Sequence, residues 1–202
     1  MSTKLIIVLA THNSSKVREI SRLMPDYEVV SMDDIGITED VVEDGDTFAA
    51  NALKKARFVA EQVDEWVMAD DSGLCIDVLD GQPGINSARW AGDDVSDLAK
   101  AEFTLAKIKD VPVGERGASF NTVAALIAPD GSEQVFEGIL RGEIMTELRG
   151  SIRPHLPYDC LFKPKGYDQT YAEMSQDEKC RISHRGIAFG KLKKYLNEQT
   201  LN

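Results

Sequence analysis

The sequence predicts an α/β protein built on a mixed β-sheet. Three observations indicate this class: a continuous apolar run at residues 5–10, helical spacing of apolar residues between later extended runs, and a strong hairpin signal in the second half. Parallel strands need a crossover connection, usually a helix, whereas a hairpin forces antiparallel pairing. The 202 residues suit one domain, or two small lobes that share a core.

The first part of the chain predicts alternating strands and helices. Residues 5–10 form a β-branched run bounded by polar residues, which is typical of a strand covered on both faces. A helix is expected over 16–24 and a short strand over 27–31. The clearest helix spans 47–63, because its apolar residues recur at helical spacing and Asp46 can cap its start.

Two adjacent aspartates lie between the next predicted strands, residues 66–69 and 74–78, in the run Asp-Asp-Ser-Gly at 70–73. Carboxylates at the end of a strand are where α/β sheets place ligands and divalent metals. Adjacent side chains on a strand point to opposite sides, so one aspartate should face a site and the other brace the turn. An Asp-rich β-turn without a ligand explains the same residues.

The second half predicts a helix, a hairpin and a C-terminal helix. Residues 97–109 have an amphipathic pattern, and the Pro-Asp-Gly-Ser run at 129–132 separates extended segments at 118–128 and 133–141. A helix over 183–197 ends in a basic turn, which suits the helix dipole.

Charge and cysteine content exclude several classes of protein. The 34 Asp+Glu against 23 Lys+Arg give a net charge of −11, which argues against nucleic acid as a partner. Three cysteines without a CxxC pair or Cys/His cluster argue against disulfides and structural zinc, and favour the cytoplasm. The apolar run at 5–10 is too short for a signal peptide or a membrane span, so no membrane association is expected.

A phosphate-binding loop is predicted between the first strand and the first helix. Such a turn exposes backbone N–H groups at the positive end of a helix dipole, and hydroxyl and lysine side chains add donors. An ordinary capped turn is the alternative, and the glycines of a Walker A loop are absent. The residues of this loop are Thr11, His12, Asn13, Ser14, Ser15 and Lys16.

Two further segments have opposite charge. Residues 33–46 contain seven acids and no Lys or Arg, a pattern typical of a solvated loop or, alternatively, of a flexible loop that contributes to a metal site. Residues 163–194 contain eight Lys/Arg against four acids, a balance of +4. Within them, Lys179 to Arg185 place Lys, Ser, His and two Arg in seven residues, which favours recognition of an anion or of the edge of a base.

Taken together, these motifs resemble those of the inosine/xanthosine triphosphate pyrophosphatases. The loop at 11–16 resembles the family's T-G-N-x-x-K, and residues 47–56 resemble T-F-x-E-N-A…K-A. The run at 69–74, with Pro-Gly-Ile at 83–85 and Ser-Ala-Arg at 87–89, is similar to A-D-D-S-G-L…P-G-x-x-S-A-R. The remaining blocks follow in order as Tyr158-Asp159, Ala172-Glu173-Met174, Lys179 and Ser183-His184-Arg185.

The resemblance implies an elongated two-lobed α/β fold with a central mixed sheet and the nucleotide in a cleft between the lobes. It implies hydrolysis of a purine nucleoside triphosphate to the monophosphate and pyrophosphate, a divalent cation, normally Mg²⁺, and a homodimer. Asp71 would be the general base and a metal ligand, with Ser72 on the phosphate. Residues 11–16 would hold the triphosphate. The base end would be bound by Leu156, Pro157, Tyr158, Asp159, Lys179, His184 and Arg185.

Three departures from the family pattern leave specificity and rate open. His12 replaces a glycine, and Ala50 replaces a metal-binding glutamate, so Glu43, Asp44, Asp46, Asp70 or water must take its place. Leu156 replaces an aromatic residue expected to stack on the base, and Pro157 stiffens its loop. The alternatives are a pyrophosphatase with shifted base preference and a nucleotide-binding protein without turnover.

Overall fold

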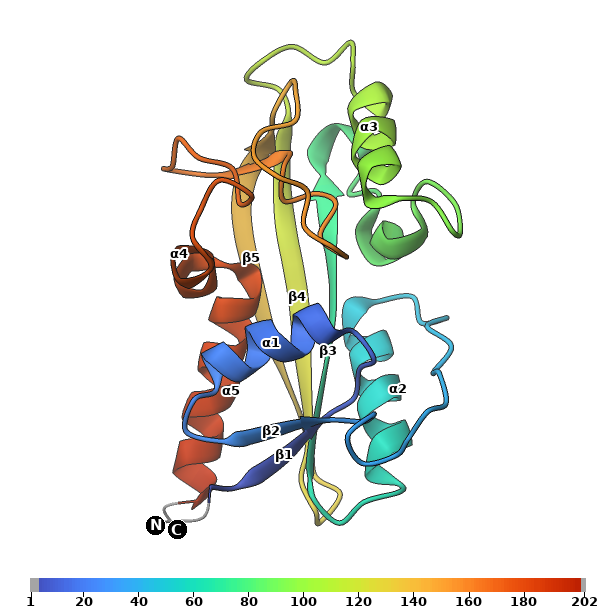
Figure 1. Cartoon of the computed structure of the whole chain (residues 1–202), viewed down its shortest axis with the longest axis vertical. Helices are drawn as coiled ribbons and strands as arrows, with labels where there is room; N and C mark the ends of the chain where they lie inside the picture. The colour runs from blue at the N-terminus through green and yellow to red at the C-terminus, as the bar shows by residue number, and fades with distance from the viewer. Residues whose placement is uncertain (1–3, 201–202) are drawn as a thin grey trace. The chain divides into compact units, whose positions relative to one another are not determined.

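The computed structural model describes residues 4–200 and has the α/β fold that the sequence predicts (Figure 1). No helix within these residues is long and apolar enough to cross a membrane. The elements, in chain order, are β1 (Ile6–Leu9), α1 (Ser14–Leu23), β2 (Glu28–Ser31), α2 (Phe48–Ala60), β3 (Trp66–Ile76), the 3-10 helices η1 (Asp77–Leu79) and η2 (Gly84–Arg89), α3 (Asp97–Lys107), β4 (Gly117–Ile127), β5 (Glu133–Ile144), β6 (Phe162–Pro164), α4 (Gln176–Ile182) and α5 (His184–Thr200).

The strands form one six-stranded sheet in the order β2-β1-β3-β4-β5-β6. Strand β1 pairs in parallel with both β2 and β3, while β5 and β6 pair antiparallel. The predicted hairpin joins β4 to β5, and its turn is closed by a hydrogen bond from the Ala128 N–H to the Ser132 carbonyl at 2.9 Å. The prediction of a mixed sheet is therefore confirmed.

The chain divides into two compact units. Unit 1 comprises residues 1–71, 122–138 and 185–202, and unit 2 comprises residues 72–121 and 139–184. Three strands, β3, β4 and β5, contribute residues to both units.

In unit 1 the sheet is covered on both faces, because its strands are apolar on both. On one face Ile7, Leu9 and Met68 pack with residues of α1 and α5. On the other face Val8, Val67 and Ala69 pack with α2. Figure 1 shows α2 across the sheet from α1 and α5. Side chains alternate between the two faces because a strand has a two-residue period. The same alternation determines to which face each later side chain of β3 points.

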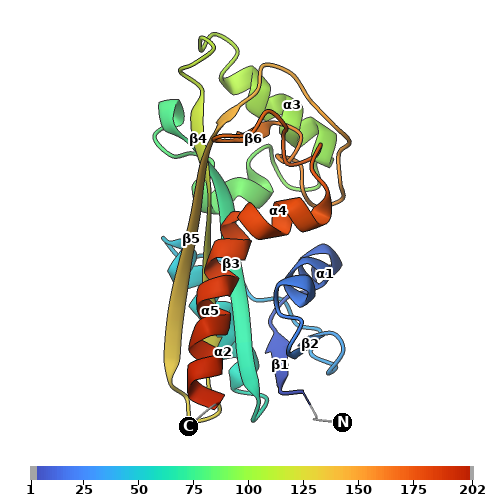
Figure 2. The ribbon, with the colours of Figure 1, turned by 90° about the vertical axis from the view of Figure 1, so that its left-hand side faces the viewer.

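The C-terminal helix α5 lies along the sheet in both views (Figures 1 and 2). Ala188, Phe189, Leu192 and Leu196 bury its apolar side. The ring of Tyr195 lies 5.6 Å from that of Phe136 on β5. This packing fixes α5, whose first turn carries the candidate site residue Arg185.

Unit 2 has its own aromatic core. Phe120 on β4 contacts the ring of Phe162 edge-on at 4.9 Å and stacks on Tyr171 at 5.6 Å. Ala101 and Ile108 add the apolar side of α3 to the same cluster.

Four local predictions were wrong. The basic residues expected in the last turn of the C-terminal helix lie further inside it, because α5 continues to Thr200. The expected turn at 70–73 does not exist, because β3 runs unbroken from Trp66 to Ile76. The cap of α2 is the side chain of Thr47, which accepts a hydrogen bond from the Ala50 N–H, and not that of Asp46. Residues 176–182 form the separate helix α4, begun by a capping box between Ser175 and Glu178, where no helix was expected.

Candidate active site

The turn between β1 and α1 holds the predicted phosphate loop. Asn13 caps α1, since its side-chain oxygen accepts hydrogen bonds from the N–H groups of Ser15 (2.9 Å) and Lys16 (3.2 Å). The Thr11 hydroxyl accepts a bond from the Asn13 N–H at 3.2 Å. The positive end of the helix dipole therefore lies at a turn of fixed shape, which begins α1 at Ser14. The turn is a capped helix start, and its binding of phosphate stays a prediction.

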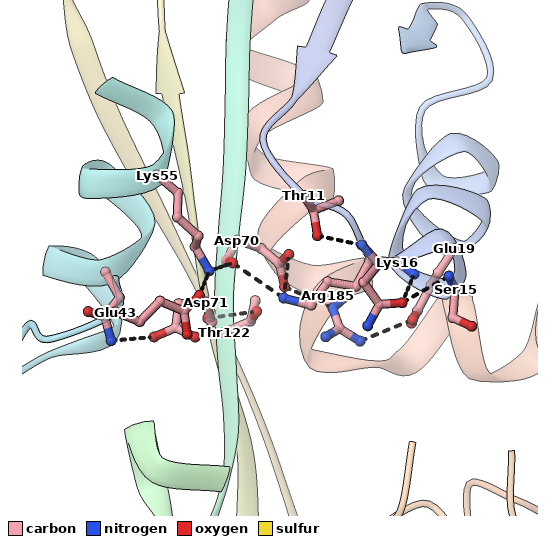
Figure 3. A network of polar contacts seen from close by, with 12 residues as sticks. Thr11, Ser15, Lys16, Glu19, Glu43, Lys55, Asp70, Asp71, Thr122 and Arg185 are labelled. Atoms are coloured by element: carbon pink, nitrogen blue, oxygen red, sulfur yellow. Dashed lines mark hydrogen bonds and ion pairs between the residues drawn. The ribbon is translucent and has the colours of Figure 1, made fainter. Parts of the chain in front are cut away.

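Asp70 and Asp71 lie on opposite faces of β3, as predicted for adjacent strand residues. Asp70 points to the face of α1 and α5, where its carboxylate lies 3.0 Å from Lys16 Nζ and 3.0 Å from Arg185 Nε (Figure 3). Arg185 also donates to Glu19 Oε2 on α1 at 3.0 Å. This buried network joins β3, α1 and α5, and it places the Lys16 ammonium beside the phosphate loop.

Burial and Asp70 act on Lys16 in opposite directions. Removal of the ammonium from water lowers its pKa, and the positive charges of Lys55 and Arg185 lower it further. The Asp70 carboxylate raises the pKa and so favours the charged form. Asp70 is thus the counter-charge that favours the ammonium form of Lys16 beside the cations Lys55 and Arg185.

Asp71 faces α2. Its carboxylate accepts a hydrogen bond from Asn51 Nδ2 at 3.0 Å, and its backbone carbonyl accepts one from the Thr122 hydroxyl at 3.2 Å. Burial raises the pKa of Asp71, and the nearby negative charge of Glu43 raises it further, whereas Lys55 lowers it. Desolvation is the largest of these effects. The result is a buried carboxylate with a raised proton affinity.

Glu43 and Lys55 complete this side of the site. Lys55 Nζ forms an ion pair with Glu43 and donates to the backbone carbonyl of Asp70 at 2.7 Å. Asn51 accepts a hydrogen bond from the Gly45 N–H at 2.8 Å, so the segment that carries Glu43 is bound to α2. Figure 3 shows Glu43, Lys55 and Asp71 grouped beside β3.

The carboxylates that could replace the glutamate expected at position 50 have different surroundings. Asp44 pairs with Lys54 and its side chain is 66% exposed, Asp46 is also exposed, and Asp70 lies on the other face of β3. Glu43 is the acid of this segment whose charge raises the pKa of Asp71, and its role as a metal ligand stays a prediction. Within residues 4–200, no group of three or more His, Cys, Asp and Glu side chains has metal-binding geometry, so a cation here would rest on these two carboxylates and other oxygens.

Sequence reasoning did not assign roles to Asn51 and Lys55. Both belong to the T-F-x-E-N-A…K-A motif, and their spacing of four residues places them on one face of α2. That spacing was the available signal. What it could not show is that this face meets Asp71, because the meeting depends on the register of β3.

Unit 2 contains the residues predicted to bind the base, except Arg185. Lys179 Nζ lies 2.6 Å from Asp159 Oδ2, and the two side chains are 1% and 4% exposed. The Lys179 ammonium also lies over the Tyr171 ring, 5.2 Å from its centre. His184 stacks on Phe120 with ring centres 4.7 Å apart. The structure thus groups a cation, an anion and an imidazole among aromatic rings.

The segment of unit 2 that carries Leu156 lacks the aromatic residue expected there. Tyr158 is buried and donates its hydroxyl hydrogen to the Ser87 carbonyl at 2.6 Å, and burial raises its pKa. Leu156 is half-buried, and the Pro157 carbonyl accepts a bond from the Cys160 thiol.

Two predicted residues, Arg185 and Ser72, belong to a different unit from the others of their predicted group. Arg185 belongs to unit 1, where it contacts Asp70 and Glu19, while its chain neighbour His184 belongs to unit 2. Ser72 follows Asp71 on β3 and is half-buried. Their contacts with a substrate stay predictions.

A capped helix start directly after a strand, a buried aspartate beside a lysine, and a mixed sheet flanked by helices are together typical of nucleotide-binding α/β proteins. Comparison with known proteins narrows the class. The model of the Ham1 family matches residues 7–195. The chain belongs to the Ham1 family.

Individual relatives are similar over nearly the whole chain. A dITP/XTP pyrophosphatase of Streptomyces coelicolor is 44% identical over 187 residues, which cover 91% of this chain and 92% of the relative. One of Bacillus subtilis is 42% identical, with 94% and 96% covered. Among solved structures, a HAM1 protein from Coxiella burnetii superposes with a TM-score of 0.85 at 36% identity, covering 96% of this chain and 99% of that one.

Proposed function

We propose that this protein hydrolyses non-standard purine nucleoside triphosphates, namely those of inosine, deoxyinosine and xanthosine, to the monophosphate and pyrophosphate. The observation that carries the proposal is the buried Asp71, whose pKa is raised, beside Glu43 and Lys55 on one face of β3. The relatives named dITP/XTP pyrophosphatases, at 42–44% identity, support the same activity.

In this proposal Asp71 is the general base that takes a proton from the attacking water. A base works best when its pKa approaches the working pH, and burial moves Asp71 in that direction. Asn51 donates to one carboxylate oxygen and so fixes the orientation of the group.

Lysines supply the charge that phosphate cleavage requires. Lys16 lies at the phosphate loop and Lys55 lies beside Asp71, both half-buried, with side chains 19% and 11% exposed. Positioned cations stabilise negative charge as it develops on the phosphate oxygens. The two lysines are fixed through Asp70, so they require little rearrangement when substrate binds.

Glu43 and Asp71 are the residues that would hold Mg²⁺. Their carboxylate oxygens are the ligands that this ion prefers, and one or two carboxylates with substrate phosphates are its usual complement. Glu43 raises the pKa of Asp71, so the two negative charges repel each other, and a cation bound by both would relieve that repulsion. When bound, the ion would polarise phosphate oxygens and lower the pKa of a bound water.

Selection of the base would fall to unit 2. Hydrogen-bond donors aimed at the 6-keto oxygen of the base would have no acceptor if adenine were bound, because adenine carries an amino group at that position. Leaving buried donors unpaired costs binding free energy. The Lys179–Asp159 pair and His184 are the buried polar groups there. The aliphatic Leu156 favours a second candidate, a pyrophosphatase with a shifted base preference.

The test is hydrolysis of inosine triphosphate with Mg²⁺ by the purified protein, with products separated by chromatography. Monophosphate and pyrophosphate are expected. Asp71→Asn should abolish turnover with little change in nucleotide affinity, and Asp44→Asn, in an exposed acid paired with Lys54, is the matched control. Release of orthophosphate, or an active Asp71→Asn, would refute the proposal, and a panel of other bases decides the second candidate.

Metal binding is tested separately. Glu43→Gln should weaken Mn²⁺ binding, measured by electron paramagnetic resonance, while Asp44→Asn should not. Equal Mn²⁺ affinity in Glu43→Gln and the wild type would remove Glu43 from the site. The homodimer that the family resemblance implies stays a prediction, which a measurement of the protein's mass in solution would test.

A further inference from the structure

His12, in the phosphate loop, contacts the acidic segment at 33–46 from both of its ring nitrogens. Nδ1 lies 2.6 Å from Asp33 Oδ1. Nε2 lies 3.3 Å from the backbone carbonyl of Glu39 and 3.6 Å from Asp40 Oδ1. One side chain thus bridges the phosphate loop to two separate points of this segment.

The chemistry of these contacts favours the imidazolium. A neutral imidazole has one N–H and one bare nitrogen, whereas all the atoms that face this ring are oxygen acceptors. Both nitrogens can donate only when the ring is protonated. The hydrogen bond to Asp33 accordingly raises the pKa of His12, and the charges of Asp33 and Asp40 act in the same direction against the effect of burial.

The contact has an electrostatic consequence for an anionic substrate. Asp33 and Asp40 lie against the same loop that is proposed to hold the triphosphate, and they would repel it. Lys16, the other cation of the loop, is already paired with Asp70. The imidazolium supplies one positive charge between the two carboxylates, where a glycine would supply none.

We propose that His12, as an imidazolium, is a positioning residue that binds the acidic segment to the phosphate loop. Its positive charge neutralises negative charge of that segment which would otherwise repel the triphosphate. The proposal rests on the proposed function for its substrate. It assigns a role to the histidine that replaces the glycine of the family motif. It also makes triphosphate affinity depend on pH in a defined direction.

The direction follows from the raised pKa. Because the pKa of His12 lies above the ordinary histidine value of about 6.5, the ring is mostly charged below that pH, and the bridge is complete there. The bridge is lost as the pH rises through the pKa that His12 has in the folded protein, which lies above this value. Triphosphate affinity should therefore fall across a window that begins above pH 6.5.

The first experiment compares KM for inosine triphosphate at pH 6 to 9 in the wild type and in His12→Gln. Loss of one charge beside two exposed carboxylates should raise KM about two- to fivefold at pH 6, with kcat little changed. The wild type should reach the KM of the variant as the pH rises. Titration of the nucleotide is common to both proteins and cancels in the ratio of their KM values.

A double variant separates charge from simple loop support. His12→Gln with Asp33→Asn removes the unshielded carboxylate and should restore most of the affinity. Asp44→Asn in the same background should not, because Asp44 pairs with Lys54 and not with His12. Loss of structural support alone predicts that Asp33→Asn brings no recovery, and that outcome would overturn the proposal.

The last measurement does not depend on turnover. Proton NMR should find the pKa of His12 above 6.5 in the free protein and lower in Asp33→Asn, and calorimetry should show the same pH dependence for inorganic tripolyphosphate. A His12 that titrates at or below 6.5, or wild-type affinity in His12→Gln, would refute the inference. Absence of hydrolysis by the wild type, with the His12 titration and tripolyphosphate binding as expected, would refute the proposed function alone.

Discussion

Two adjacent aspartates should respond in opposite ways to the same substitution. Asp70 and Asp71 are both buried, with 2% and 5% of their surface exposed, and Asp→Asn changes each by one atom. Asp70 is held by two cations, whereas Asp71 has a raised pKa. We expect Asp70→Asn to destabilise the fold and Asp71→Asn to leave it as stable as the wild type, or more so.

The size of the Asp70 effect follows from its partners. Removal of one member of a buried ion pair costs about 3–5 kcal/mol, because the other charge stays buried without compensation. Lys16 retains 19% exposure and Arg185 keeps Glu19, so the lower end, about 3 kcal/mol, applies. For a chain of this size each kcal/mol moves the melting temperature by about 2–4 °C, so a fall of about 6–12 °C is expected.

The Asp71 effect has the other sign. A carboxyl group with a raised pKa binds more protons in the folded than in the unfolded chain, so stability falls as pH rises from about 3.9 through the folded pKa. The wild type therefore loses stability as the pH rises toward and past the folded pKa. Asparagine carries no charge to desolvate and still accepts from Asn51, so the loss disappears.

The free energy of unfolding of both variants and of the wild type is measured in urea and by heat, at pH 7 and at pH 4 to 5. The stability difference between Asp71→Asn and the wild type should grow from low pH to pH 7. Equal destabilisation by both variants at pH 7 would show that the two carboxylates have equivalent surroundings, and would refute the reasoning.

Three further predictions concern unit 2. Asp159→Asn should lower the free energy of unfolding by about 3–5 kcal/mol, measured in urea, because it leaves Lys179 a buried cation without its counter-ion. Tyr158→Phe should cost about 1 kcal/mol in the same assay, the worth of one hydrogen bond to the Ser87 carbonyl. Gly73→Ala would place a Cβ 2.1 Å from a backbone carbonyl oxygen, and circular dichroism with thermal melting should show a loss of about 3 kcal/mol or more.

The sequence predicted the elements whose pattern is local. The run at 5–10 became β1, the helical spacing at 47–63 became α2, and the Pro-Asp-Gly-Ser turn produced the β4–β5 hairpin. Each depends on neighbours in sequence, because periodicity and turn chemistry are properties of a few consecutive residues.

The error at 70–73 arose because partners from distant segments decide the local structure there. The Asp-Asp-Ser-Gly run indicated a turn, since these residue types favour turns, but Lys16 and Arg185 compensate Asp70 and Asn51 binds Asp71, so β3 continues. The absence of a side chain at Gly73 allows the same strand to approach another backbone segment closely. Neither the partners of the two aspartates nor the backbone segment beside Gly73 can be read from residues 66–78 alone.

The two faces of β3 explain how so acidic a chain can bind an anionic substrate. The network of Figure 3 contains three cations and four carboxylates, a charge of 3 − 4 = −1. On one face, Asp70 and Glu19 are each bound to a cation and cannot approach a ligand without breaking that contact. On the other, Glu43 and Asp71 are the pair proposed to bind a divalent ion, whose two positive charges would make the whole network positive. Recognition of a triphosphate then depends on where each carboxylate is held and not on the net charge of −11. The two-residue period of β3 creates this separation, because it directs neighbouring aspartates to opposite faces of the sheet.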